Sequence, residues 1–216
     1  MRKVLISFVM VFAGAAQADE IVIAALGDSL TQGYGLPVED GFVPQLQAWL
    51  DAQGTDVRLI NAGVSGDTTA GGLARVDWTL TPDVEGMIVT LGGNDLLRGL
   101  SPAQARANLN GILDAADRAK VDVLLVGMTA PTNFGAGYKT GFDALYPDLA
   151  DKHGAALYPD FFAGLLADDV ARADAVRLYF QRDGIHPNAV GVARIVADIG
   201  PAVAELAQRI AAQTDN

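Results

Sequence analysis

The 216-residue sequence contains no cysteine. Disulfide bonds, thiolate metal ligands and a cysteine nucleophile are therefore excluded, and the stability of the fold must come from packing. Basic residues are scarce too, since 15 lysines and arginines stand against 26 acidic residues and form no cluster. The net charge of −11 argues against a nucleic-acid partner and against adsorption to anionic lipid. We interpret the acidity as a solubility feature.

Cofactor motifs are also missing from the sequence. No Walker A sequence is present, and no Gly-x-Gly-x-x-Gly follows the first apolar run that is predicted to be a strand. No group of histidines and acidic residues has the sequence spacing of a metal site. We therefore expect the protein to use no nucleotide, no metal and no organic cofactor.

Only the N-terminus carries a long apolar run. Arg2 and Lys3 precede the apolar residues 4–14, and residues 16–18 (Ala-Gln-Ala) place small side chains at alternate positions. This order is typical of a secretory signal peptide, and we expect cleavage after Ala18. The alternative is an uncleaved membrane anchor, but a spanning helix needs roughly 20 apolar residues, which this run does not reach. The sequence thus predicts a periplasmic or secreted protein without stable membrane insertion.

Residues 19–216 are predicted to form one domain, because they contain no linker, low-complexity tract or internal repeat. Short apolar runs rich in β-branched residues alternate with segments of helical spacing. Buried strands alternating with helices imply an α/β fold, with a parallel sheet of about five strands inside a three-layer αβα sandwich. The expected strands are residues 20–26, 57–61, 86–91, 121–127 and a weaker 155–158, and the expected helices are 42–52, 69–80, 102–119, 141–152 and 189–211.

Polar, glycine-rich loops follow the first four predicted strands. They comprise residues 27–29 (Gly-Asp-Ser), 61–67 (Asn-Ala-Gly-Val-Ser-Gly-Asp), 92–95 (Gly-Gly-Asn-Asp) and 129–138. Ligands of parallel α/β sheets bind beyond the carboxyl ends of the strands. We therefore expect the functional site to be built from these four loops.

Ser29 is a candidate nucleophile, which requires a base to take its proton, and histidine is the usual base. The chain has two histidines. His153 precedes a glycine that would end a helix, a position typical of a structural role. His186 lies in the sequence DGIHP, where Asp183 could turn back onto the imidazole as the third member of a triad. The alternative role for Asp183 and His186 is to cap the helix that follows Asn188.

An acyl-transfer site also needs hydrogen-bond donors for the oxyanion. The amide of Ser29, the amide of Gly63, whose missing side chain would let an ester approach, and the carboxamide of Asn94 could converge from adjacent strands. The alternative is that these are ordinary turn residues. Asp28, Asp67 and Asp95 are expected to hold the loops together through side-chain hydrogen bonds.

Four motifs together resemble the ordered sequence blocks of the SGNH hydrolases, also called the GDSL esterase/lipase family. They are GDSLTQGYG, NAGVSGDTTAGGLAR, LGGNDLLRG and DGIHPN, and the resemblance runs from about Ile21 to the last helix. In detail the chain is similar to the bacterial acyl-CoA thioesterase I, protease I and lysophospholipase L1 group. The segments MTAPTNFG and LYPDFF are closer to its arylesterase members. The resemblance implies that residues 19–216 form an SGNH hydrolase domain with a flavodoxin-like fold.

The resemblance also implies roles for individual residues. Ser29 would be the nucleophile, His186 the base and then the acid, and Asp183 the group that orients the imidazole. Ser29, Gly63 and Asn94 would form the oxyanion hole. The loop after the fourth strand would cover the acyl chain, and the candidate substrate contacts are Leu96, Pro131, Asn133 and Phe134. Any one of these four side chains could instead serve only packing.

The function implied is that of a serine esterase that hydrolyses carboxylic esters or thioesters through an acyl-enzyme. Its substrates would be small molecules or lipids, such as aryl esters, short to medium acyl esters, acyl thioesters or lysophospholipids, and no protein partner is implied. The alternatives are a carbohydrate O-acetylesterase, a non-catalytic periplasmic module that binds lipid or glycan, and a flavodoxin-like cofactor carrier.

Overall fold

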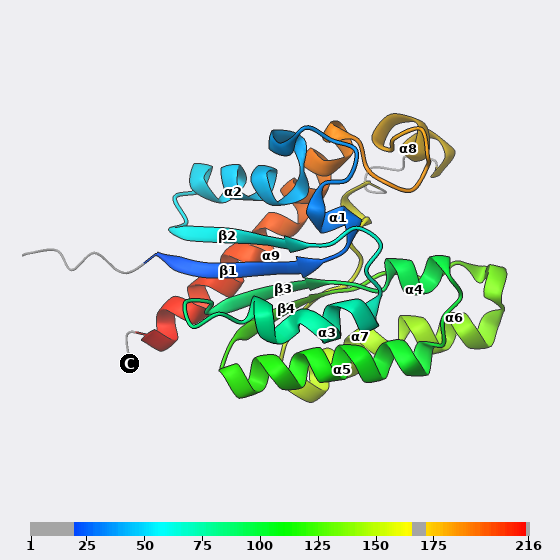
Figure 1. Cartoon of the computed structure of the whole chain (residues 1–216). Coiled ribbons are helices and arrows are strands. Elements are labelled where there is room, and N and C mark those ends of the chain that lie inside the picture. Colours follow the sequence, from blue (N-terminus) through cyan, green and yellow to red (C-terminus); the bar gives the residue numbers. More distant parts are fainter. Residues whose placement is uncertain (1–19, 166–171, 215–216) are drawn as a thin grey trace, which may run out of the picture.

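A parallel sheet of five strands, in the order β2-β1-β3-β4-β5, lies at the centre of the computed structural model (Figure 1). The structure describes residues 20–165 and 172–214, so the predicted signal peptide, residues 1–18, lies outside the described residues. The strands are β1 (Ile21–Gly27), β2 (Val57–Gly63), β3 (Gly86–Thr90), β4 (Asp122–Val126) and β5 (Ala156–Tyr158). The prediction of an α/β fold with a parallel sheet is confirmed.

Helices connect the strands and cover both faces of the sheet. They are α1 (Ser29–Gln32), α2 (Phe42–Ala52), α3 (Thr69–Thr79), α4 (Gly93–Leu97), α5 (Pro102–Ala119), α6 (Ala136–Asp143), α7 (Leu145–His153), α8 (Arg172–Tyr179) and α9 (Ala189–Thr214), with single 3-10 turns at η1 (Val38–Asp40), η2 (Thr132–Phe134) and η3 (Ala163–Leu165). The α2 and α9 helices pack together on one face, whereas α3, α5 and α7 cover the other (Figure 1). This is the predicted three-layer arrangement.

The register of β1 aligns the carboxyl ends of three strands. Gly27, the last residue of β1, lies opposite Gly63 of β2 and Thr90 of β3. Residues 22–27 are buried because helices cover both faces of this central strand. The segments that leave β1, β2 and β3 therefore start side by side at one edge of the sheet.

The single helix predicted for residues 141–152 is wrong, because the structure has two helices there. The first, α6, ends at Asp143, and α7 begins at Leu145. Pro147 lies in the first turn of α7, where a backbone N–H has no acceptor within the helix, so the N–H that proline lacks is not needed. In one continuous helix its ring would clash with the carbonyl of Asp143. The α6 helix also begins at Ala136, inside the predicted loop 129–138.

Two short helices, α1 and α4, were not predicted from the sequence. The α1 and α4 helices directly follow β1 and β3, and each is too short to show a periodic apolar pattern. Among the described helices, none combines the length and the apolar character that crossing a bilayer requires.

Candidate active site

Ser29, His186 and Asp183 meet at the carboxyl edge of the sheet. Ser29 is the first residue of α1, two residues after the end of β1, and its Oγ lies 2.9 Å from His186 Nε2. On the other side of the imidazole, Nδ1 lies 2.7 Å from Asp183 Oδ2. A proton on Nδ1 donates to the carboxylate and leaves Nε2 as the acceptor for the serine hydroxyl. This is the geometry of a serine nucleophile, a base and an orienting acid.

The loop that carries His186 is fixed by Asp183 itself. Asp183 Oδ1 accepts hydrogen bonds from the amides of Ile185 and His186, at 2.9 and 3.0 Å. Burial is the largest influence on the pKa of Asp183 and raises it, but hydrogen bonds from the His186 side chain and from these two amides lower the pKa to about 2. Asn188, not Asp183, caps α9, because Asn188 Oδ1 accepts the amide of Gly191. The Asp183 carboxylate is thus ionised at neutral pH and directed at the imidazole.

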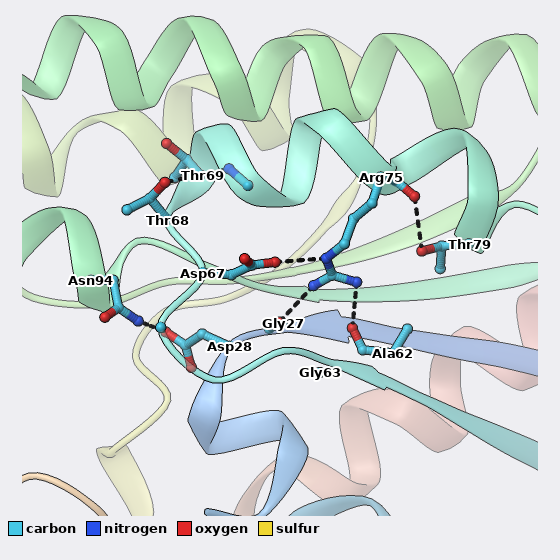
Figure 2. Close-up of polar contacts among 12 residues, drawn as sticks. Gly27, Asp28, Ala62, Gly63, Asp67, Thr68, Thr69, Arg75, Thr79 and Asn94 are labelled. Atoms are coloured by element: carbon cyan, nitrogen blue, oxygen red, sulfur yellow. Dashed lines mark hydrogen bonds and ion pairs between the residues drawn. The ribbon is translucent and has the colours of Figure 1, made fainter.

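Asp28 is a buried carboxylate between the serine turn and Asn94. Its Oδ1 accepts the amide of Leu30 at 3.0 Å, and its Oδ2 accepts Asn94 Nδ2 at 3.1 Å (Figure 2). Only 1% of Asp28 is exposed, and this burial raises its pKa to about 6 although both hydrogen bonds act in the opposite direction. The Asn94 amide group has two hydrogens, so the second remains for another acceptor.

The prediction that Asp67 and Asp95 hold the loops together through their side chains is confirmed. Asp95 is buried, and its two oxygens accept the amide and the hydroxyl of Thr69, at 2.8 and 2.7 Å. Asp67 Oδ2 pairs with Arg75 Nε at 2.6 Å. Because Asp95 lies on α4 and Thr69 on α3, this pair joins the two helices that begin beside the site.

The Gly63 amide does not have the surroundings expected of a free donor. It donates to Asn61 Oδ1 at 3.0 Å, and the next amide, of Val64, donates to Gly27 of β1. Successive amides of a strand point in opposite directions, so that of Gly63 points away from β1. Close packing, rather than the approach of an ester, explains why residue 63 is a glycine. A Cβ at this position would lie 2.3 Å from the backbone nitrogen of Gln32 in α1.

Gly66 lies in the same loop, between the serine helix and the Asn94 helix. On one side Ser65 donates to Gln32 Oε1 of α1, and on the other Arg98 donates to the carbonyl of Gly66. Gly66 has φ of 85°, a backbone conformation that favours glycine. Sequence analysis missed this residue, and the signal available was the second glycine of NAGVSG.

Tyr34 and Gln181 border the site and were also missed. The Tyr34 ring packs against the His186 ring with centroids 4.6 Å apart. Gln181 Nε2 donates to the carbonyls of Tyr34 and Pro187, which joins the loop after α1 to the loop of His186. A pocket here is lined by Ser29, Leu30, Gly33, Tyr34, Leu36, His186, Pro187 and Val192.

None of the four predicted substrate contacts lines this pocket. Leu96 packs against the core, whereas the neighbouring Leu97 is 61% exposed. Pro131, Asn133 and Phe134 are exposed on the loop after β4, and the Phe134 ring lies against Gly99, just beyond α4. Their contacts with substrate stay a prediction.

His153 has the structural surroundings that its sequence position indicates. Its side chain is 5% exposed, with Nδ1 2.6 Å from Asp117 Oδ2 and Nε2 3.1 Å from Asn110 Oδ1. Ligand atoms of His153, Asp117 and Asp114 lie within 4.8 Å of one another, a proximity that the sequence spacing did not reveal because the residues come from α5 and α7. Both ring nitrogens are engaged in joining these two helices.

Comparisons with known proteins agree on one family. The family model of the GDSL-like lipases/acylhydrolases matches residues 25–194. Esterase TesA of Pseudomonas aeruginosa is 36% identical over 191 residues, which cover 88% of this chain and 91% of that protein. Thioesterase 1/protease 1/lysophospholipase L1 of Escherichia coli is 35% identical over 175 residues, or 81% of this chain and 78% of that protein. The crystal structure of AlinE4, an SGNH-hydrolase family esterase, is 48% identical, with a TM-score of 0.70 over 88% of this chain and 98% of its own.

The raised pKa of Asp28 generates a prediction for stability. Between its ordinary pKa of 3.8 and about 6, the folded protein holds a proton that the unfolded chain has released, so the free energy of unfolding falls as pH rises. The loss reaches about 3 kcal/mol above pH 6, at about 1.4 kcal/mol per pKa unit. We expect the free energy of unfolding of Asp28→Asn, relative to wild type, to rise by about this amount from pH 4 to pH 7.5 in urea titrations. Parallel stability curves for the two proteins would contradict this account.

Proposed function

Since the chain belongs to the GDSL-like lipase/acylhydrolase family and is a carboxylic ester hydrolase, we propose that Ser29 is its nucleophile, His186 its base and Asp183 the group that orients the base. One observation carries this assignment. The His186 imidazole lies within hydrogen-bond distance of Ser29 Oγ through Nε2 and of Asp183 through Nδ1. These three residues come together where α/β sheets bind their ligands.

The reaction proceeds in two steps through an acyl-enzyme. Ser29 Oγ attacks the carbonyl carbon while its proton passes to His186 Nε2, and the Asp183 carboxylate stabilises the imidazolium. The tetrahedral intermediate collapses, and His186 returns the proton to the leaving alcohol or thiol. Water then attacks the acyl-Ser29 ester with His186 again as base, which releases the acid and restores the serine.

The oxyanion is held by the Ser29 amide and by the second hydrogen of Asn94 Nδ2. Gly66 is our assignment for the third donor, in place of Gly63. The support is that the Gly63 amide is bound to Asn61, whereas Gly66 lies in the loop between α1 and α4. Donors fixed before the reaction stabilise the oxyanion without reorganisation.

Substrates enter from solvent at an open edge of the sheet. The exposed Leu97 lies on α4 with Asn94, and the exposed Phe134 packs against Gly99 just beyond α4, so both offer apolar contact to an acyl chain, together with Pro131 and Asn133. A serine esterase with this site accepts either an alcohol or a thiol as the leaving group, because His186 protonates both. We therefore propose small-molecule carboxylic esters, acyl thioesters and lysophospholipids as the substrate range.

The first test is hydrolysis of p-nitrophenyl esters from acetyl to palmitoyl. We expect Ser29→Ala to lower kcat by roughly 10⁴-fold or more, because the reaction loses its nucleophile. Ser101→Ala is the matched control, since Ser101 is an exposed serine outside the proposed triad and makes no side-chain cap bond at the start of α5. Equal activity of Ser29→Ala and wild type would remove Ser29 from the mechanism. Absence of turnover by wild type across the whole series would favour a binding module, and activity on acetyl alone would favour sugar deacetylation.

A second test removes one oxyanion donor. Asn94→Ala is expected to lower kcat by roughly 10²- to 10³-fold, because the lost hydrogen bond stabilises the transition state more than the bound ester. Steady-state kinetics on the best p-nitrophenyl ester measure the effect, and circular dichroism checks the fold. Full kcat in a folded Asn94→Ala protein would exclude this residue from the oxyanion hole.

We further propose export, with residues 1–18 removed, on the charge and hydropathy pattern of that segment. Expression of the full chain in a Gram-negative host should give a periplasmic protein that begins at Asp19. N-terminal sequencing or intact-mass measurement of the periplasmic fraction tests this, with a variant lacking residues 2–18 as the cytoplasmic control. A protein that keeps residues 1–18 in the membrane fraction would instead indicate an anchor.

A further inference from the structure

Arg75 of α3 connects three backbone segments at the carboxyl edge of the sheet. Its Nη2 donates to the carbonyl of Gly27 at 2.8 Å, its Nη1 to the carbonyl of Ala62 at 2.7 Å, and its Nε to Asp67 Oδ2 at 2.6 Å (Figure 2). All three nitrogens of the guanidinium are thus engaged. The Arg75 side chain is 23% exposed and that of Asp67 18%, so this ion pair is largely withdrawn from water.

Each of the three segments leads directly to a proposed catalytic group. Gly27 is two residues before Ser29, Ala62 is the last residue but one of the strand from which the loop of Gly66 leaves, and Asp67 is the next residue after Gly66. The Gly27 carbonyl also accepts the amide of Val64, so the first residues of that loop are held at the same point. The guanidinium therefore fixes the serine turn relative to the loop that carries the third oxyanion donor.

The helix that carries Arg75 is itself held against the Asn94 helix. Thr69 at the start of α3 is bound twice by Asp95, the residue after Asn94, and Asn108 of α5 donates to the Thr69 hydroxyl. A Cβ on Gly71 would lie 2.6 Å from Asp67 Oδ1, so glycine there leaves room for the carboxylate beside the first turn. The α3 helix thus makes hydrogen bonds to the segments that carry all three proposed oxyanion donors: Arg75 contacts those of Ser29 and Gly66, and Thr69 contacts that of Asn94.

We propose that Arg75 is a positioning residue for the ester hydrolase reaction, which sets the spacing between the Ser29 turn and the Gly66 loop through its bonds to Gly27, Ala62 and Asp67. The inference rests on the proposed function of Ser29. Arg75 does not contact the substrate, and it acts through the backbone that it holds. A planar guanidinium is required, because a lysine ammonium cannot reach three acceptors in these directions.

The test compares the kcat of Arg75→Lys and Arg75→Ala with that of wild type, each divided by the concentration of functional active sites. A p-nitrophenyl alkylphosphonate that esterifies the nucleophile is reacted to completion, and the released p-nitrophenol counts the competent sites. We expect kcat per titrated site to fall about 10- to 100-fold in both variants with KM changed less than about threefold, because small displacements of reacting groups cost up to about 10²-fold in rate. Ethylguanidinium, but not ethylammonium at equal concentration, should restore part of the loss in Arg75→Ala.

Arg58→Ala is the matched control for loss of a paired arginine. Arg58 lies near the start of β2, at the end of that strand away from the site, pairs with Glu20 and Asp83, and has a side chain that is 47% exposed. We expect its kcat per site to equal that of wild type. Should Arg75→Ala fail to fold, Arg75→Lys and Asp67→Asn carry the test, because both keep a polar side chain at the substituted position.

Two outcomes separate this inference from the proposed function. If the phosphonate titrates wild type but not Ser29→Ala, and the Arg75 variants keep wild-type kcat per site while their melting temperature falls, Arg75 only stabilises the fold and the inference is overturned. If the phosphonate fails to titrate wild type, or titrates Ser29→Ala equally, the assignment of Ser29 fails instead. A fall in kcat per site with unchanged KM supports Arg75 as a positioning residue.

Discussion

The in-register parallel pairing of β1 with β2 and β3 is the constraint on which the candidate site depends. It places Gly27 opposite both Gly63 and Thr90, so that the segments leading to Ser29, Gly66 and Asn94 leave the sheet from adjacent positions. A slip of one residue in either pairing would turn every side chain of that strand to the other face of the sheet, and the buried core on both sides opposes such a slip. The relative positions of the loops and first helical turns that carry the site therefore follow from the strand register of the sheet beneath them.

Two carboxylates of the site are held in opposite electrostatic environments. Asp28 is buried between β1 and Asn94, and desolvation makes its charge unfavourable. Asp183 lies in a more exposed loop, where two backbone amides and the His186 side chain favour its charge over the opposing effect of burial. Environments that separate the pKa values of neighbouring acids are a mark of functional sites. Desolvation opposes the ionised form of Asp28, and the same buried carboxyl group accepts a hydrogen bond from Asn94.

Preorganisation in this protein depends on polar bonds between elements that lie far apart in the sequence. Arg75 holds the ends of β1 and β2, Asp95 joins α4 to α3, and Gln181 joins the loop after α1 to the loop of His186. Each of these side chains donates or accepts more than one bond, so each fixes an orientation as well as a distance. Without cysteine, these bonds and the apolar core together keep the segments of Ser29, Gly66 and Asn94 in place.

The sequence by itself determined the alternation of strands and helices and the family, and it singled out Ser29, Asp183 and His186 as the candidate triad, because apolar periodicity and short motifs are local properties of a chain. It also placed Asp28, Asp67 and Asp95 among the residues that tie the loops. Only the tertiary structure showed that the Gly63 amide donates to Asn61, since the direction of this amide follows from the pairing of β2 with β1. The parts played by Arg75, Gln181 and Tyr34 likewise depend on contacts between segments that no local pattern connects. Pro147 divided a predicted helix because the clash of its ring with a carbonyl one turn earlier outweighs the periodicity around it.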